Sequence, residues 1–149
     1  MLHYAALGLP IKLNTEMTNH YFWKQAAQEV DLIEKQVIQQ TGQKPLIVGL
    51  SKWSIASALR FYDVDGQVDN IVSRNAIGKS ATMLEQWTNP ADWNGHPVIF
   101  VSFNSKDLQS VQIDHFADLL KPPETRDITL NNNKLRSLHF RIAEHYHMQ

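Results

Sequence analysis

Two short apolar segments constrain the fold of this chain more than any other feature of its sequence. Residues 45–50 and 97–103 are nearly continuous series of Leu, Ile, Val and Phe. Runs of this length and composition are typical of strands that are covered on both faces, as in the parallel sheets of α/β proteins. A long segment with helical patterning separates the two, which is the order expected of parallel strands joined by crossover connections.

The strongest helical pattern precedes the first of these strands. Between residues 18 and 41, apolar side chains recur every three or four positions, and Gly42 followed by Pro45 predicts the end of the helix. Asparagines at 131–133 separate two extended runs and tolerate positive φ angles, so they predict a hairpin. The remaining elements expected from periodicity and turn residues are helices at 52–62, 80–87 and 107–120, a strand at 68–73, and hairpin strands at 126–130 and 135–146.

These elements predict one α/β domain over residues 1–149. The expected architecture is an open three-layer sandwich with a mostly parallel sheet and a C-terminal antiparallel hairpin. Residues 1–10 form a short apolar run that ends at Pro10. It is too short to span a bilayer, and we read it either as a first strand or as the remnant of a preceding membrane helix.

Composition narrows the classes of function. The chain has 14 Lys and Arg against 15 Asp and Glu, a net charge of −1, and no run of like charges. Nucleic acid is therefore not an expected partner, because binding to a phosphate backbone requires a basic surface. The absence of cysteine excludes disulfides, zinc ribbons, iron–sulfur clusters and thiol nucleophiles.

No catalytic motif is complete. Gly78-Lys79-Ser80 resembles the end of a phosphate-binding P-loop, but Ser73 stands where that motif needs a glycine. After the first apolar strand the bulky Trp53 stands where a dinucleotide-binding turn needs a glycine. We therefore assign no catalytic residue and expect no cofactor.

Histidines near the C-terminus raise the question of a metal site. His139, His145 and His147 share one face of the predicted last strand, and an i, i+2 pair of histidines can chelate a divalent ion. The nearby Glu144 has the opposite parity, so no carboxylate is expected on that face. We therefore favour a solvated strand face over a metal site.

Polar side chains follow each predicted parallel strand. In open α/β sheets, ligands bind beyond the carboxyl ends of the strands, where cations and hydrogen-bonding groups converge. Such a patch is suited to an anionic or sugar group, although polar residues there also serve as helix caps. The residues at these positions are Ser51, Lys52 and Trp53, then Arg74 and Asn75, then Asn104 and Ser105.

The segment 51–62 resembles a pattern in bacterial membrane glycosyltransferases of the protein mannosyltransferase and aminoarabinose transferase type. In their soluble C-terminal domain, a short apolar strand precedes an alanine-serine pair, a leucine and a phenylalanine-tyrosine pair. Here these are Ala56, Ser57, Leu59, Phe61 and Tyr62. Further similar fragments follow in the expected order over most of the chain: His3-Tyr4 to Pro10, Trp23, Ser73-Arg74-Asn75, the region of Trp87 and Trp93, and the strand at 97–103.

The resemblance implies an integral membrane enzyme that transfers a sugar from a polyprenyl-phosphate donor to a lipid or protein acceptor. It places this domain on the periplasmic side of the cell membrane, with the membrane portion of the same polypeptide and the lipid-linked sugar or acceptor as partners. The catalytic acids of that family lie in its membrane part, so the chain alone is expected to be inactive. Lys52, Arg74 and Asn75 are the residues expected to contact substrate or a lipid headgroup, because cations attract phosphates.

Two other readings use the same strand-end patch. One is a stand-alone α/β module that binds a small ligand or a partner protein. The other is a soluble enzyme, which is disfavoured because the sequence contains neither a nucleophile-base pair nor a phosphate loop.

Overall fold

A computed structural model describes residues 15–51, 55–63, 66, 68–79, 88–109 and 111–148 of the chain. The expected helix at 80–87 and the segment 1–10 lie outside these residues. The described helices are α2 (Thr15–Thr41), α3 (Ile55–Phe61) and α4 (Val111–Asp114), and the 3₁₀ helices are η1 (Arg74–Ile77), η3 (Pro90–Trp93) and η4 (Ser105–Gln109). The described strands are β1 (Leu46–Gly49), β2 (Ile71–Val72), β3 (Val98–Ser102), β4 (Glu124–Leu130) and β5 (Asn133–Ala143).

The strands form a five-stranded mixed sheet in the order β2-β1-β3-β5-β4. β1 pairs in parallel with β2 and β3, whereas β5 is antiparallel to both β3 and β4. All residues of β1 and β3 are buried, as their apolar composition predicts. The predicted α/β content, the two buried parallel strands and the C-terminal hairpin are therefore confirmed, while the sheet as a whole is mixed.

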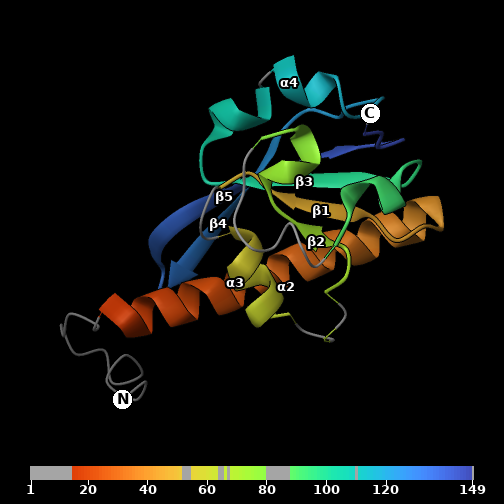
Figure 1. Cartoon of the computed structure of the whole chain (residues 1–149). Helices are drawn as coiled ribbons and strands as arrows, with labels where there is room; N and C mark the ends of the chain where they lie inside the picture. The colour runs from red at the N-terminus through yellow and green to blue at the C-terminus, as the bar shows by residue number, and fades with distance from the viewer. Residues whose placement is uncertain are drawn as a thin grey trace.

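Both faces of the sheet are covered. Ile47 and Ile99 belong to one buried cluster, which includes residues of α2 and α3, and Val48 and Phe100 belong to a second cluster with residues of η1, η4 and α4. Alternate strand residues point to opposite faces, so a continuous apolar strand supplies both clusters. Figure 1 shows α2 and α3 below the sheet and α4 above it.

The long helix α2 follows the predicted pattern. Its buried face carries Phe22, Ala26, Val30, Ile33 and Val37. Gly42, with a φ of 73°, donates its backbone N–H to the carbonyl of Ile38 at 2.8 Å, which is a left-handed helix cap. No helix in the described part of the chain is long and apolar enough to cross a bilayer.

The predicted helix at 107–120 is correct only in part, because no continuous helix spans this range. The chain instead forms η4 and the short α4, and Asp118 then makes an isolated antiparallel bridge with Glu144. The N–H of His147 also donates to the carbonyl of Phe116 at 2.9 Å. These bonds to the C-terminal segment replace the bonds that would continue a helix, and they connect residues that sequence periodicity cannot relate.

The predicted hairpin is confirmed, but its second strand runs over Asn133–Ala143 where residues 135–146 were predicted. Asn131 and Asn132 form the turn with φ angles of 51° and 64°, as a two-residue type I′ turn requires. Leu138, Phe140 and Ile142 are buried, in agreement with the predicted parity. β5 ends at Ala143 instead of continuing to residue 146. The predicted strand at 68–73 is likewise reduced to Ile71–Val72.

Tyr146 connects the C-terminal segment to η1. Its side chain is buried, its hydroxyl donates to the carbonyl of Ala76, and burial raises its pKa above the ordinary value of about 10. A raised pKa means that the folded state holds the phenolic proton more tightly than the unfolded state does. The contribution of this group to stability is therefore complete below pH 10 and is lost as the pH rises above that value.

We expect Tyr146→Phe to lower the free energy of unfolding by about 1–2 kcal/mol at neutral pH, because the buried carbonyl of Ala76 loses its donor. Urea denaturation at a series of pH values measures both effects. The difference between the native protein and the variant should shrink above pH 10, as the native protein loses this contribution. A difference that is constant into the alkaline range would contradict the assignment.

Candidate functional site

Hydrogen bonds connect the segments that directly follow the parallel strands. The backbone N–H of Leu50, directly after β1, donates to the carbonyl of Val101 in β3 at 2.9 Å. Directly after β2, the buried Ser73 donates its hydroxyl to the carbonyl of Ser51 at 3.3 Å. The ends of β1, β2 and β3 are thus held side by side at one edge of the sheet.

A short series of side-chain hydrogen bonds orders the segment that follows β3. Ser102 is buried, and its hydroxyl donates to Oδ2 of Asp107 at 2.7 Å and accepts the N–H of Asn104 at 3.0 Å. The side-chain oxygen of Asn104 accepts the N–H of Lys106 at 3.0 Å. These bonds start η4 immediately after the strand and fix Lys106 and Asp107 at the same edge as the other strand ends.

The exit of β2 forms the 3₁₀ helix η1. The N–H of Ala76 donates to the carbonyl of Ser73 at 3.1 Å, and Gly78 ends the helix with a φ of 75°. The N–H of Lys79 then donates to the carbonyl of Arg74 at 3.1 Å. The left-handed turn at Gly78 therefore brings Lys79 back beside Arg74, the first residue of the helix.

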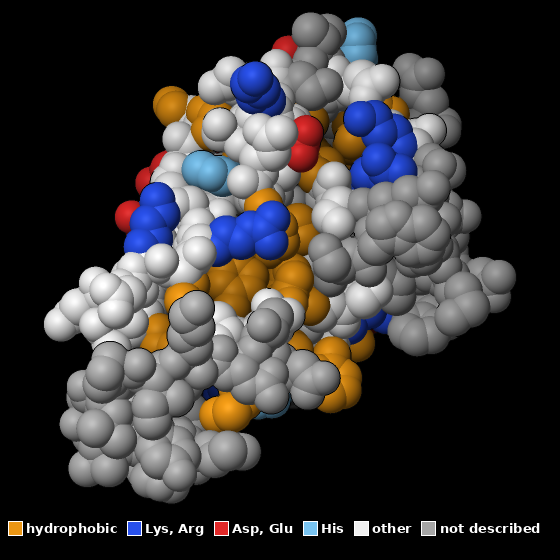
Figure 2. Space-filling model, turned by 90° about the vertical axis from the view of Figure 1, so that its left-hand side faces the viewer, with side chains coloured by type: hydrophobic (Ala, Val, Ile, Leu, Met, Phe, Trp, Pro, Cys, Tyr) orange, Lys and Arg blue, Asp and Glu red, His pale blue; other side chains and the backbone are white. Residues whose placement is uncertain are grey.

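A cavity of about 400 Å³ opens between these exits. Its described lining residues include three cations and one carboxylate, so the net charge of these residues is positive. Among the described residues, neither Lys79 nor Lys106 takes part in an ion pair. Figure 2 shows several separate Lys and Arg side chains on one side of the molecule, the left-hand side of Figure 1. The lining residues are Leu50, Arg74, Ile77, Lys79, Lys106 and Asp107.

The predicted site residues are distributed unequally around this cavity. Arg74 lines it, as expected of a residue at the end of a parallel strand. Asn75 is the next residue in η1 but is not part of the lining; its side-chain oxygen is buried, and no described residue donates a hydrogen bond to it. Lys52 and Trp53 lie outside the described residues.

Sequence reasoning missed two of the cations. Lys79 belongs to the Gly78-Lys79-Ser80 sequence, which is an incomplete P-loop, and Lys106 directly follows Asn104 and Ser105 of the predicted strand-end patch. Both cations lie within eight residues of the end of a strand, Val72 of β2 or Ser102 of β3. Counting the lysines in these exit loops would have found them.

The C-terminal histidines do not share a strand face as predicted. His139 lies in β5 and its Nδ1 is 2.9 Å from the hydroxyl of Thr125, whereas His145 and His147 lie beyond the strand. A carboxylate that the sequence did not predict, Asp118, lies 3.9 Å from His145 and 3.6 Å from His147. Even so, within the described ranges no group of three His, Cys, Asp or Glu is arranged to hold a metal ion.

Comparisons with known proteins leave the chain without an assigned family. No protein-family model, curated protein or solved structure shows a significant match to it.

Proposed function

We propose that this chain is a non-catalytic domain of an integral membrane glycosyltransferase, which transfers a sugar from a polyprenyl-phosphate donor to a lipid or protein acceptor. The domain would lie on the periplasmic side and bind an anionic group of the lipid-linked sugar or of the acceptor. The observation that carries the proposal is the cavity lined by Arg74, Lys79 and Lys106. The resemblance of residues 51–62 to such enzymes supplies the reaction class.

The chemistry of the cavity suits a phosphate. Hydrogen bonds from Lys and Arg to phosphate oxygens are charge-assisted and about twice as strong as neutral ones. Among the described lining residues the three cations outnumber the one carboxylate, Asp107, which gives the cavity a positive balance. No histidine or glutamate is among its described lining residues, which suits binding better than proton transfer.

We further infer that the architecture is an open three-layer sandwich. The support for this is that separate buried clusters cover the two faces of the sheet. Ligands of such folds bind at the carboxyl edge of the parallel strands, where the cation-lined cavity lies.

The second candidate function is a stand-alone module that binds a small anion, and the same cavity supports it. An immunoblot of native cell fractions with an antibody against this domain separates the two functions. A band much heavier than this chain, in a membrane fraction that resists extraction with salt and alkali, is expected for a domain of an integral enzyme. A soluble band of the chain's own mass would reject the membrane enzyme in favour of the module.

Both candidates predict an anion site that depends on particular cations. We expect Arg74→Ala and Lys106→Ala each to weaken binding of geranyl phosphate, a short isoprenoid phosphate, by about tenfold, because each removes a charge-assisted hydrogen bond. Isothermal titration measures the affinity, and added salt should weaken it further.

Lys24→Ala is the matched control, because Lys24 is an exposed lysine of α2 that does not line the cavity. Its affinity should equal that of the native protein, and all three variants should unfold at similar urea concentrations. Equal affinities in the native protein and both cavity variants would remove this cavity as the anion site.

A further inference from the structure

A second cavity lies at the opposite edge of the sheet. Its volume is about 350 Å³, within the usual range of roughly 300–1,000 Å³ for small-ligand sites. Asp69 precedes β2 and His96 precedes β3, so the cavity is at the amino ends of the parallel strands, away from Arg74 and Lys106. Its lining residues are Asp69, Thr88, Asn89, Asp92, Trp93 and His96.

Hydrogen bonds fix the orientation of most of these side chains. Nδ1 of His96 lies 2.8 Å from the carbonyl of Lys44, and because a carbonyl only accepts, this nitrogen carries the proton. In the neutral ring Nε2 is then an acceptor. Oδ1 of Asn89 accepts the N–H of Ala91 at 3.1 Å, so its amide nitrogen remains the donor end.

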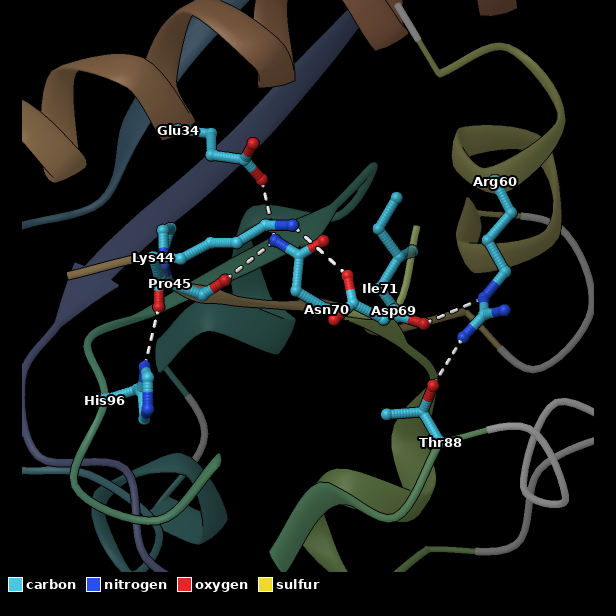
Figure 3. A network of polar contacts seen from close by, with 9 residues as sticks. All are labelled: Glu34, Lys44, Pro45, Arg60, Asp69, Asn70, Ile71, Thr88 and His96. Carbon is cyan, nitrogen blue, oxygen red and sulfur yellow. Dashed lines mark hydrogen bonds and ion pairs between the residues drawn. The ribbon is translucent and has the colours of Figure 1, made fainter. Parts of the chain in front are cut away.

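The other polar groups are anchored from outside the cavity. Asp69 forms an ion pair with Lys44 at 3.2 Å through Oδ1, and the hydroxyl of Thr88 accepts a hydrogen bond from Arg60 at 2.9 Å (Figure 3). The carboxylate of Asp69 has a second oxygen, and the hydroxyl of Thr88 still has its own proton to donate. The described lining thus combines several acceptors with side-chain donors from Thr88, Asn89 and the indole N–H of Trp93.

The aromatic component is Trp93, whose ring meets His96 edge to face with centroids 4.9 Å apart and an interplanar angle of 67°. The ring is partly exposed and partly packed against the second buried cluster. An indole offers a flat apolar surface to a ligand, while the surrounding carboxylates accept hydrogen bonds from hydroxyl groups.

We propose that this cavity binds a neutral sugar ring, whose C–H face packs on Trp93 and whose hydroxyls donate to Asp69, Asp92 and His96. A sugar ring has both an apolar face and several hydroxyl donors, which matches this lining. Among the residues that the structure describes, the lining contains two carboxylates and no Lys or Arg, so an anionic ligand is disfavoured. The site is independent of the phosphate site at the other edge and does not require the proposed membrane enzyme.

Saturation-transfer NMR of the chain with glucose, mannose, galactose and N-acetylglucosamine tests the proposal. We expect at least one of these sugars to bind. Asp92→Asn and Trp93→Ala should each lower the affinity for that sugar by about tenfold, because each variant loses one good contact. Asp92 is exposed and outside both buried clusters, so its variant remains informative if Trp93→Ala does not fold.

Lys24→Ala is the control and should leave sugar binding unchanged, because Lys24 is an exposed lysine of α2 that lines neither cavity. Failure of all four sugars to bind would overturn the proposal. So would sugar binding that neither Asp92→Asn nor Trp93→Ala weakens, or a phosphorylated sugar that binds through Asp92 more tightly than its neutral form. None of these outcomes affects geranyl phosphate binding, so the two sites can fail separately.

Discussion

Asn70→Ala should lower the free energy of unfolding by about 3 kcal/mol, because it removes two hydrogen bonds from a site without solvent. Asn70 is completely buried. Its amide nitrogen donates to Oε2 of Glu34 at 2.7 Å and to the carbonyl of Pro45 at 2.8 Å. Both amide protons are therefore used, one of them on a carboxylate.

The position of Asn70 explains why the expected effect is large. Figure 3 shows it between α2, which carries Glu34, and the segment that enters β1 at Pro45. Glu34 is only 7% exposed, so a carboxylate that loses this donor cannot be fully solvated instead. The side-chain oxygen of Asn70 is buried without a described hydrogen-bond partner, and its removal offsets part of the loss.

Urea denaturation of Asn70→Ala and Asp69→Ala provides a matched comparison of neighbouring residues. Asp69 is 72% exposed and pairs with Lys44 at the surface, so its substitution should cost less than about 1 kcal/mol. The double variant Glu34→Gln with Asn70→Ala should cost less than the sum of the two single variants, because the two side chains share a bond. Similar losses for Asn70 and Asp69 would contradict the role given to this network.

The same region shows where sequence reasoning stops. Periodicity identified α2, and apolar composition identified β1 and β3. The burial of these elements follows from a pattern of residues within each segment, so it can be predicted from local sequence. Asn70 directly precedes β2 and lies within the strand predicted at 68–73. Its burial depends on Glu34 and Pro45, which are far away in the sequence, so no local pattern predicts it.

The residues of the cation-lined cavity were likewise only partly predictable from the sequence. Arg74 was predicted because it directly follows a strand, and the ends of parallel strands meet at one edge. Lys79 reaches the cavity through the left-handed turn at Gly78, and Lys106 through the cap formed by Asn104. The direction of such side chains is set by loop hydrogen bonds, which depend on the folded arrangement of the strand exits.

Gly49→Val should destabilise the fold by about 3 kcal/mol or more, because the end of β1 has no space for a side chain. A Cβ atom on Gly49 would lie 2.8 Å from the backbone nitrogen of Ala56 and 3.0 Å from the side chain of Ile55. Ala56 and Ile55 begin α3 and are buried, so the obstacle is a packed backbone and cannot rotate away. The helix would have to move off the strand.

Gly42→Ala is the control for the loss of a glycine as such. A Cβ at Gly42 would meet no described atom within 4 Å, but its φ of 73° is left-handed, so the expected cost is about 1 kcal/mol of backbone strain. Urea denaturation gives both values, and amide exchange should show selective loss of protection in α3 of Gly49→Val. If the two variants were equally stable, α3 would not pack on β1 at this distance.

Because Leu50 follows Gly49 and lines the cation-lined cavity, a displaced strand end should also weaken geranyl phosphate binding in Gly49→Val but not in Gly42→Ala.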